Sequence, residues 1–341
     1  MKGKSLGCLI IFLLLALFVS VGVNMLQFVT WFGVDESAIG LSQARQPRLK
    51  ETLEQSSVNE SKDKIVRIDL EGIIGSGAVG EKFGGGGMDL DTIKRALIQA
   101  VEDKSVRAIV LRVNSPGGEV TASDTLYHAV KEAAQKKPVV VYMDSLAASG
   151  GYYVSCGATK VVANETTLTG SIGVIIQTLN YSQTFGKIGL ETMTFASGSF
   201  KDTLGGARQM RDDEKAYVQS LVMKMYDKFI GIVSEARKIS KDELKNGIAD
   251  GRVFTGGEAL QLKLVDQIGY VEDAYTLAKQ LGGAPNAMVI RYQHRASFGD
   301  LLGAFGKAQD AQGKVNIDIS DRLLPRLQPG MTYLLPAYLA P

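Results

Sequence analysis

From residue 64 onward, short runs of β-branched residues alternate with longer segments whose apolar residues recur at helical spacing, and no other feature restricts the fold as strongly. Leu90, Ile93 and Leu97 mark one such amphipathic helix, with Asp89 before it as the N-cap. This alternation predicts an α/β domain with parallel strands. The predicted strands are residues 64–74, 106–113, 138–143, 160–164, 170–176 and 191–196, and the predicted helices are 89–104, 121–137, 149–158 and 211–237.

The carboxyl ends of the predicted strands carry the segments with the most unusual composition. In an α/β sheet, ligands bind beyond these ends. "NSPGG" at 114–118 and "LAASGG" at 146–151 both lie there, as does the loop after the predicted strand 191–196. We therefore expect three segments that are far apart in the sequence to meet at one site.

The N-terminus is a long apolar segment. Lys2 and Lys4 precede a run with no charged residue before Asp35, which exceeds the roughly 20 residues needed to cross a bilayer. The run continues to Trp31 and Phe32, so an uncleaved anchor is favoured over a cleaved signal peptide. Because positive flanks stay in the cytoplasm, the rest of the chain is expected on the outer side of the membrane.

A polar stretch follows the anchor and is typical of a linker or a loose helix that holds the domain away from the membrane. No internal repeat is present. The predicted organisation is a cytoplasmic N-terminus at 1–5, a transmembrane anchor at 6–32, a polar linker at 33–62, a folded domain at 63–292 and a C-terminal tail at 293–341.

Composition and short motifs exclude several classes of site. The net charge of +2 gives no indication of nucleic acid as a partner. Cys8 lies in the apolar segment and Cys156 in the folded domain, so neither a disulfide nor a zinc site is expected. "GSGAVG" at 75–80 matches a dinucleotide-binding fingerprint, but four glycines at 84–87 follow where a helix should begin. We interpret this stretch as a mobile flap over a cleft.

"NSPGGEV" combines a proline with two glycines. Pro116, Gly117 and Gly118 predict a tight turn whose backbone amides are not shielded by side chains. Taken alone, the motif fits an ordinary turn between a strand and a helix. The functional interpretation is an oxyanion hole, which requires preorganised N–H groups with close access, and Gly118 is its candidate donor.

Ser149 lies between two alanines and two glycines in "SLAASGGYY", where a strand ends and a helix is expected to begin. A serine in this place usually caps the helix. The small neighbours also leave its hydroxyl sterically open, and free N–H groups at a helix start suit a developing oxyanion. This motif alone therefore allows Ser149 to be either a helix cap or a nucleophile.

A serine nucleophile needs a base. His128 lies in the middle of a predicted helix and His294 near the end of the folded domain, so a Ser-His-Asp triad is disfavoured. Lysine serves as a base when burial lowers its pKa from about 10.4 to near 7–8. Lys201 in "GSFKD" is the candidate, against the alternative of a surface lysine. Ser171 in "TGSIGV" either relays a hydrogen bond from the lysine or is a plain turn serine.

Four motifs together follow the order and spacing of a known family. "NSPGG", "SLAASGGYYVS", "TGSIGV" and "GSFKD" resemble the bacterial signal peptide peptidase A family of membrane-anchored serine/lysine peptidases, over about residues 63–292. The resemblance implies a crotonase-like (Clp-protease-like) fold, a repeated β-β-α superhelix, and no metal or cofactor. It also assigns roles: Ser149 as nucleophile, Lys201 as general base, Ser171 as the residue that orients the lysine, and the amides of Gly118 and Gly150 as the oxyanion hole.

The same resemblance implies substrates and assembly. With one copy of each motif, the chain is similar to short members of the family, which form rings whose serine and lysine come from neighbouring subunits. We therefore expect a homo-oligomer in which Lys201 acts in trans and which degrades cleaved signal peptides and other apolar peptides at the outer face of the cytoplasmic membrane. A non-catalytic membrane scaffold with the same fold is the alternative. An acyl-CoA enzyme is disfavoured by the expected outer location.

The C-terminus, "PGMTYLLPAYLAP", carries no charged side chain and is strongly apolar. A tail of this kind is unusual on a soluble domain. It is expected either to be buried within its own chain, to pack on a neighbouring subunit or to dock in the substrate groove as a pseudo-substrate.

Overall fold

The computed structural model describes residues 13–24, 48–75, 89–293 and 333–334. The chain divides into two units, residues 1–48 and 49–341. In the first unit, residues 13–24 are helical. No helix among the described residues has both the length and the apolar composition needed to cross a bilayer. The predicted anchor at 6–32 extends beyond the described part of this unit on both sides.

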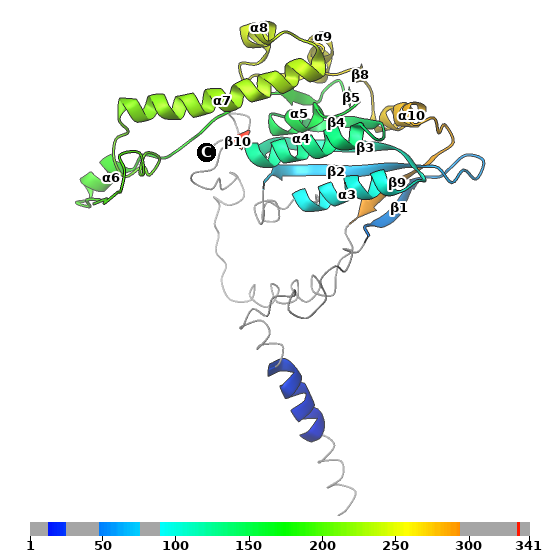
Figure 1. Cartoon of the computed structure of the whole chain (residues 1–341), viewed down its shortest axis with the longest axis horizontal. Helices are drawn as coiled ribbons and strands as arrows, with labels where there is room; N and C mark the ends of the chain where they lie inside the picture. The colour runs from blue at the N-terminus through cyan, green and yellow to red at the C-terminus, as the bar shows by residue number, and fades with distance from the viewer. Residues whose placement is uncertain (1–12, 25–47, 76–88, 294–332, 335–341) are drawn as a thin grey trace, which may run out of the picture. The chain divides into compact units, whose positions relative to one another are not determined.

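A mixed sheet forms the frame of the second unit (Figure 1). Its strands run in the order β1-β9-β2-β3-β4-β5-β8, with β2, β3, β4 and β5 mutually parallel. The predicted α/β domain with parallel strands is therefore confirmed. The strands are β1 (Lys50–Gln55), β2 (Lys64–Ile74), β3 (Val106–Glu119), β4 (Val139–Ala148), β5 (Lys160–Ala163), β6 (Leu168–Gly170), β7 (Val253–Thr255), β8 (Gln267–Ile268), β9 (Met288–Gln293) and β10 (Tyr333–Leu334).

Helices cover both faces of this sheet. Val66, Ile68 and Leu70 of β2 point into the larger core, which includes residues of α3, α4 and α5. Ile65 points to the opposite face, where it packs with residues of α10. The helices are α3 (Leu90–Glu102), α4 (Val120–Ala134), α5 (Gly150–Ser155), α6 (Ser182–Lys187), α7 (Asp212–Arg237), α8 (Lys241–Glu243), the π-helix η2 (Leu244–Ile248), α9 (Gly256–Gln261) and α10 (Val271–Leu281).

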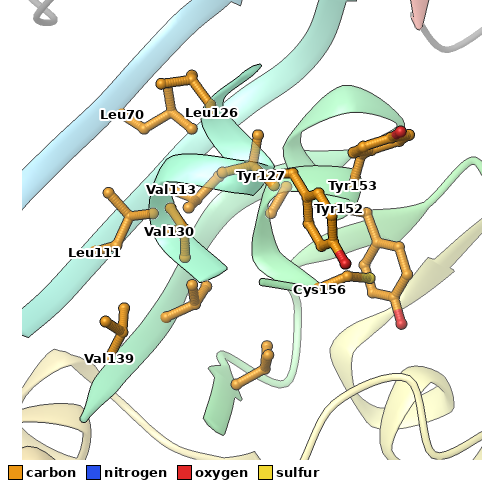
Figure 2. Packing of buried hydrophobic residues seen from close by; sticks show 14 of the residues in the cluster. Leu70, Leu111, Val113, Leu126, Tyr127, Val130, Val139, Tyr152, Tyr153 and Cys156 are labelled. Carbon is orange, nitrogen blue, oxygen red and sulfur yellow. The ribbon is translucent and has the colours of Figure 1, made fainter. Parts of the chain in front are cut away.

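Aromatic rings join α5 to the helices beside it, and Figure 2 shows Tyr127 of α4 with Tyr153 of α5. The Tyr153 ring of α5 lies 5.6 Å from the Tyr127 ring of α4 and 4.8 Å from the Phe229 ring of α7, measured between centroids. The Tyr153 hydroxyl also donates to Asp124 of α4 at 2.8 Å. The helix that begins after Ser149 is therefore fixed in the core, and one end of α7 is fixed with it.

Cys156 closes the other end of α5 and is a packing residue. Its side chain is buried, and burial raises the pKa of the thiol from 9.0 to about 12. In a Cys8→Ser background, we expect thiol reagents to modify the native protein at least about a hundredfold more slowly than the denatured protein, because the thiolate is the reactive form. Equal rates in the two states, measured by the absorbance of a disulfide reagent, would contradict this burial.

Several local predictions are wrong. Residues 191–196 are not a strand and pair with no strand in the described part of the chain, and Met193 and Phe195 in this stretch are exposed. "NSPGG" is not a tight turn, because Gly117 and Gly118 continue β3 and pair with the end of β2 through a register shift. The predicted strand 170–176 ends at its first residue, where β6 stops.

The helix cap is confirmed, one stretch of the expected linker is a strand, and two further predictions fall on residues outside the described part of the chain. Asp89 caps α3 as predicted, accepting a hydrogen bond from the Thr92 amide at 2.8 Å. Residues 50–55, inside the expected linker, form β1 and pair with β9. The domain boundaries themselves stay a prediction. The glycine stretch at 76–88 and His294 lie outside the described residues.

Candidate active site

Ser149 stands at the junction of β4 and α5 in a strained backbone conformation. Its φ of 52° and ψ of −112° lie outside the regions that L-residues usually occupy. The Ser149 amide donates to the Gly170 carbonyl at 2.8 Å, which holds this conformation in place. Strain of this kind persists only where the surroundings impose it, and it gathers at functional sites.

The hydroxyl of Ser149 does not cap the helix that follows it. No hydrogen bond from α5 reaches the side chain, and Oγ has no hydrogen-bond partner among the described residues although the residue is fully buried. An unpaired buried hydroxyl costs on the order of 1–3 kcal/mol. The capping interpretation is therefore wrong, and the side chain is available for another role.

Ser171 directly follows β6, at the position next to the one where Ser149 follows β4. β4 and β6 are parallel, and Ala148 pairs with Gly170, so Ser149 and Ser171 each follow one member of this pair. Ser171 is also buried and also has a positive φ, of 50°. Its amide donates to the Arg252 carbonyl at 2.8 Å. The two serines therefore directly follow paired positions on adjacent strands, and such strands lie about 4.8 Å apart.

Gly118 and Gly150 bring two backbones into close contact. A Cβ atom on Gly150 would lie 3.1 Å from the Gly118 nitrogen and 3.0 Å from the Gly117 Cα. A Cβ atom on Gly118 would overlap the backbone of Ile74. Only glycine fits at either place without a shift, and the contact puts two candidate amide donors beside Ser149.

Ser123 of α4 is a further polar residue at this junction, and sequence reasoning missed it. Its Oγ lies 2.5 Å from the position a Gly150 Cβ would take. The residue is fully buried, and its hydroxyl has no hydrogen-bond partner among the described residues. Nothing in the sequence distinguishes it from an ordinary serine in an amphipathic helix.

Lys201 lies apart from these residues. It is exposed in the loop between α6 and α7, and since Ser149 Oγ has no partner in the described part of the chain, the two side chains do not bond within it. α7 packs near α5 through Phe229, whereas Glu214, which contacts the loop, lies 15 residues earlier, roughly 22 Å along a helix axis. Figure 1 shows α6 and this loop beyond the edge of the sheet.

Of the three segments predicted to meet, 114–118 and 146–151 do so, whereas the loop after residues 191–196 does not. His128 is exposed on α4, with Nε2 3.9 Å from Asp124 Oδ1, and takes no part in the site. Within the described ranges, histidine, cysteine and carboxylate side chains nowhere form a group of three that would hold a metal ion.

Comparisons with known proteins identify the family of this chain. A family model described as Peptidase family S49 matches residues 131–284, which include Ser149, Ser171 and Lys201. A protein named "Putative signal peptide peptidase SppA" from Enterococcus faecium is 34% identical over 296 residues, covering 86% of this chain and 83% of that protein. The chain belongs to peptidase family S49. It is a serine peptidase.

Two further similarities accompany this assignment. "Putative protease slr0021" of a Synechocystis species is 35% identical over 226 residues, covering 65% of this chain and 76% of that protein. Among solved structures, a mutant of ClpP1 from Listeria monocytogenes aligns with a TM-score of 0.40 and 17% identity, over 61% of this chain and 93% of that one.

Proposed function

We propose that the chain is a membrane-anchored serine endopeptidase with a Ser149/Lys201 dyad that degrades cleaved signal peptides and other apolar peptides at the outer face of the cytoplasmic membrane. The observation that carries this proposal is the unpaired, buried hydroxyl of Ser149 on a strained backbone between two glycine-lined strands. Most buried hydroxyls are hydrogen-bonded, so an unpaired one on a strained backbone beside two candidate amide donors suits a nucleophile.

The chemistry is acyl transfer. The Lys201 amine takes the proton of the Ser149 hydroxyl, and Oγ attacks the peptide carbonyl carbon. The amides of Gly118 and Gly150 hold the resulting oxyanion. As the tetrahedral intermediate collapses, the lysine gives its proton to the leaving amine, and water then attacks the acyl-enzyme by the same route. Ser171 hydrogen-bonds the amine and orients it toward Ser149.

The base comes from a neighbouring protomer in a homo-oligomeric ring. Lys201 is exposed, and Ser149 has no base in the described part of its own chain. The segment that carries Lys201 also exposes large apolar side chains, which is typical of an interface. The most exposed are Phe195 at 91%, Leu179 at 78%, Met193 at 75% and Ile188 at 65%.

Peptides bind to this site as an added strand. β10 of the C-terminal tail lies antiparallel to β3, with Leu334 opposite Gly118 and Tyr333 opposite Glu119. Main-chain pairing of this kind accepts extended peptides with little regard to sequence. β10 therefore mimics an extended apolar substrate, in line with the name of the Enterococcus relative.

Membrane attachment and the detailed fold belong to the same proposal. The uncharged N-terminal run supports the anchor at 6–32, and the positive flank of Lys2 and Lys4 supports the outer location of the domain. The succession β2-α3, β3-α4, β4-α5 supports a crotonase-like superhelix.

A serine-directed fluorophosphonate probe tests the function. We expect the full-length protein in detergent to be labelled at Ser149 and to hydrolyse an apolar peptide, whereas Ser149→Ala does neither. The alternative, a non-catalytic scaffold, predicts no labelling of either form. Absence of labelling across alkaline pH, where lysine is uncharged, would sink the dyad.

A further inference from the structure

One arginine joins the loop that carries Lys201 to the first turn of α7. Arg208 donates to both carboxylate oxygens of Asp202, from Nε at 2.9 Å and from Nη2 at 2.7 Å. The same guanidinium donates to both oxygens of Glu214, from Nη1 at 2.8 Å and from Nη2 at 2.5 Å. Planar, bidentate contacts of this type fix geometry as well as adding energy. Asp202, Arg208 and Glu214 are called the arginine clamp below.

Glu214 is the fixed end of the arginine clamp. Its side chain is fully buried, and it also accepts from Thr203 Oγ1 at 3.1 Å and from the Arg211 amide at 2.8 Å. The hydrogen bonds from Arg208 lower the pKa of Glu214 to about 2, so the carboxylate stays charged at neutral pH. A negative charge in the first turn of a helix is favourable. Because the Glu214 carboxylate is buried, loss of Arg208 would leave a buried charge with less compensation, unlike the loss of a partner in an exposed ion pair.

The residues before Lys201 are held as well. Arg211 donates from Nη2 to the Ser199 carbonyl at 3.1 Å, and its guanidinium lies 5.5 Å from the centre of the Phe200 ring. The chain is therefore attached to α7 on both sides of Lys201, while the lysine side chain stays exposed. The Lys201 amine is therefore exposed, while the backbone on both sides of it is held against α7.

We propose that Asp202, Arg208 and Glu214 are positioning residues that set where Lys201 stands relative to α7. This inference rests on the proposed function, in which Lys201 is the base for the Ser149 of a neighbouring protomer. α7 packs near α5 at one end and is joined to the Lys201 loop at the other. The arginine clamp therefore holds the loop in a fixed position relative to the core of the domain. Without it, the amine would move by about an ångström or more, and a misplacement of that size costs on the order of 10²-fold in rate.

The test is Arg208→Ala in the full-length oligomer. We expect kcat for an apolar peptide to fall about 10²-fold with KM little changed, because peptides are proposed to pair with β3 and not with this loop. We also expect guanidinium chloride at a non-denaturing concentration to restore part of the lost kcat, with sodium chloride at equal ionic strength having no effect. Lys215→Ala is the matched control. It breaks an exposed pair with Asp212 at 2.8 Å in the same helical turn and should change neither constant.

Asp202→Asn serves as the second variant, since it keeps the side-chain shape and removes the charge. If the Arg208→Ala oligomer dissociates, or if guanidinium does not restore its kcat, the result for Asp202→Asn is decisive. An intact Asp202→Asn oligomer with kcat lowered at least about tenfold supports the proposal. Wild-type kcat in either clamp variant, or dissociation of both, overturns it. An unlabelled wild type or a fully active Lys201→Ala would instead sink the proposed function, whatever the clamp variants do.

Discussion

Two inactive variants, Ser149→Ala and Lys201→Ala, should regain activity when they are assembled into the same oligomer. Each variant alone should lose peptidase activity by on the order of 10⁴-fold or more, because a nucleophile and its base act as a unit. In mixed rings, a site with a Ser149 from one protomer and a Lys201 from the next should form at about one quarter of the interfaces, since head-to-tail contacts pair the two chains at random. Peptide hydrolysis by rings co-expressed with two different affinity tags measures the recovery.

Absence of recovered activity in the mixed rings would contradict a dyad shared between protomers. If both residues of a dyad came from one chain, every site in a mixed ring would lack one of them, and activity would stay at the level of the single variants. Rings of each variant co-expressed with itself, purified through the same two tags, give that baseline. The unpaired Ser149 hydroxyl and the exposed Lys201 side chain are the observations that favour recovery.

Much of the fold follows from periodicity in the sequence. β2, α3, α4 and α7 appear within three residues of the predicted ranges, because the apolar residues of each recur at the period of its secondary structure. β3 and β4 begin within one residue of the predicted starts, as expected of buried apolar runs, but continue six and five residues beyond the predicted ends. The segment 191–196 has the composition of a strand but no partner in the described part of the chain, so its pattern misleads. β1 was hidden because its residues are mostly polar and it forms an edge strand.

The site was less accessible to sequence reasoning than the fold. Small residues around Ser149 predict an open hydroxyl, whereas the residue is fully buried in this chain. Its positive φ, with which the side chain makes no capping bond, is held by the hydrogen bond to the Gly170 carbonyl, which the local sequence does not reveal. The adjacency of Ser171 depends on strand register, which no local pattern encodes. Glu214 is one of three acidic residues at the start of α7, and only packing shows which of them is buried.

Gly118→Ala should remove both activity and part of the stability. A methyl group at this position would overlap the Ile74 carbonyl group, which belongs to the strand paired with β3 and cannot rotate away as a side chain can. The overlap is expected to cost about 1–3 kcal/mol of unfolding free energy. It would also displace the Gly118 amide from Ser149, and loss of one oxyanion donor lowers kcat by about 10²–10³-fold.

Gly231→Ala is the matched control for this change. Gly231 lies within α7, where an added Cβ would meet only the flexible end of Lys241 at 4.0 Å. The substitution should therefore stabilise the chain by about 0.5–1 kcal/mol without altering kcat. Chemical denaturation and peptide hydrolysis on the two variants separate the steric effect from a general intolerance of alanine. If Gly118→Ala kept wild-type kcat, its amide would not hold the oxyanion, and the second donor beside Gly150 would have to come from a different backbone group.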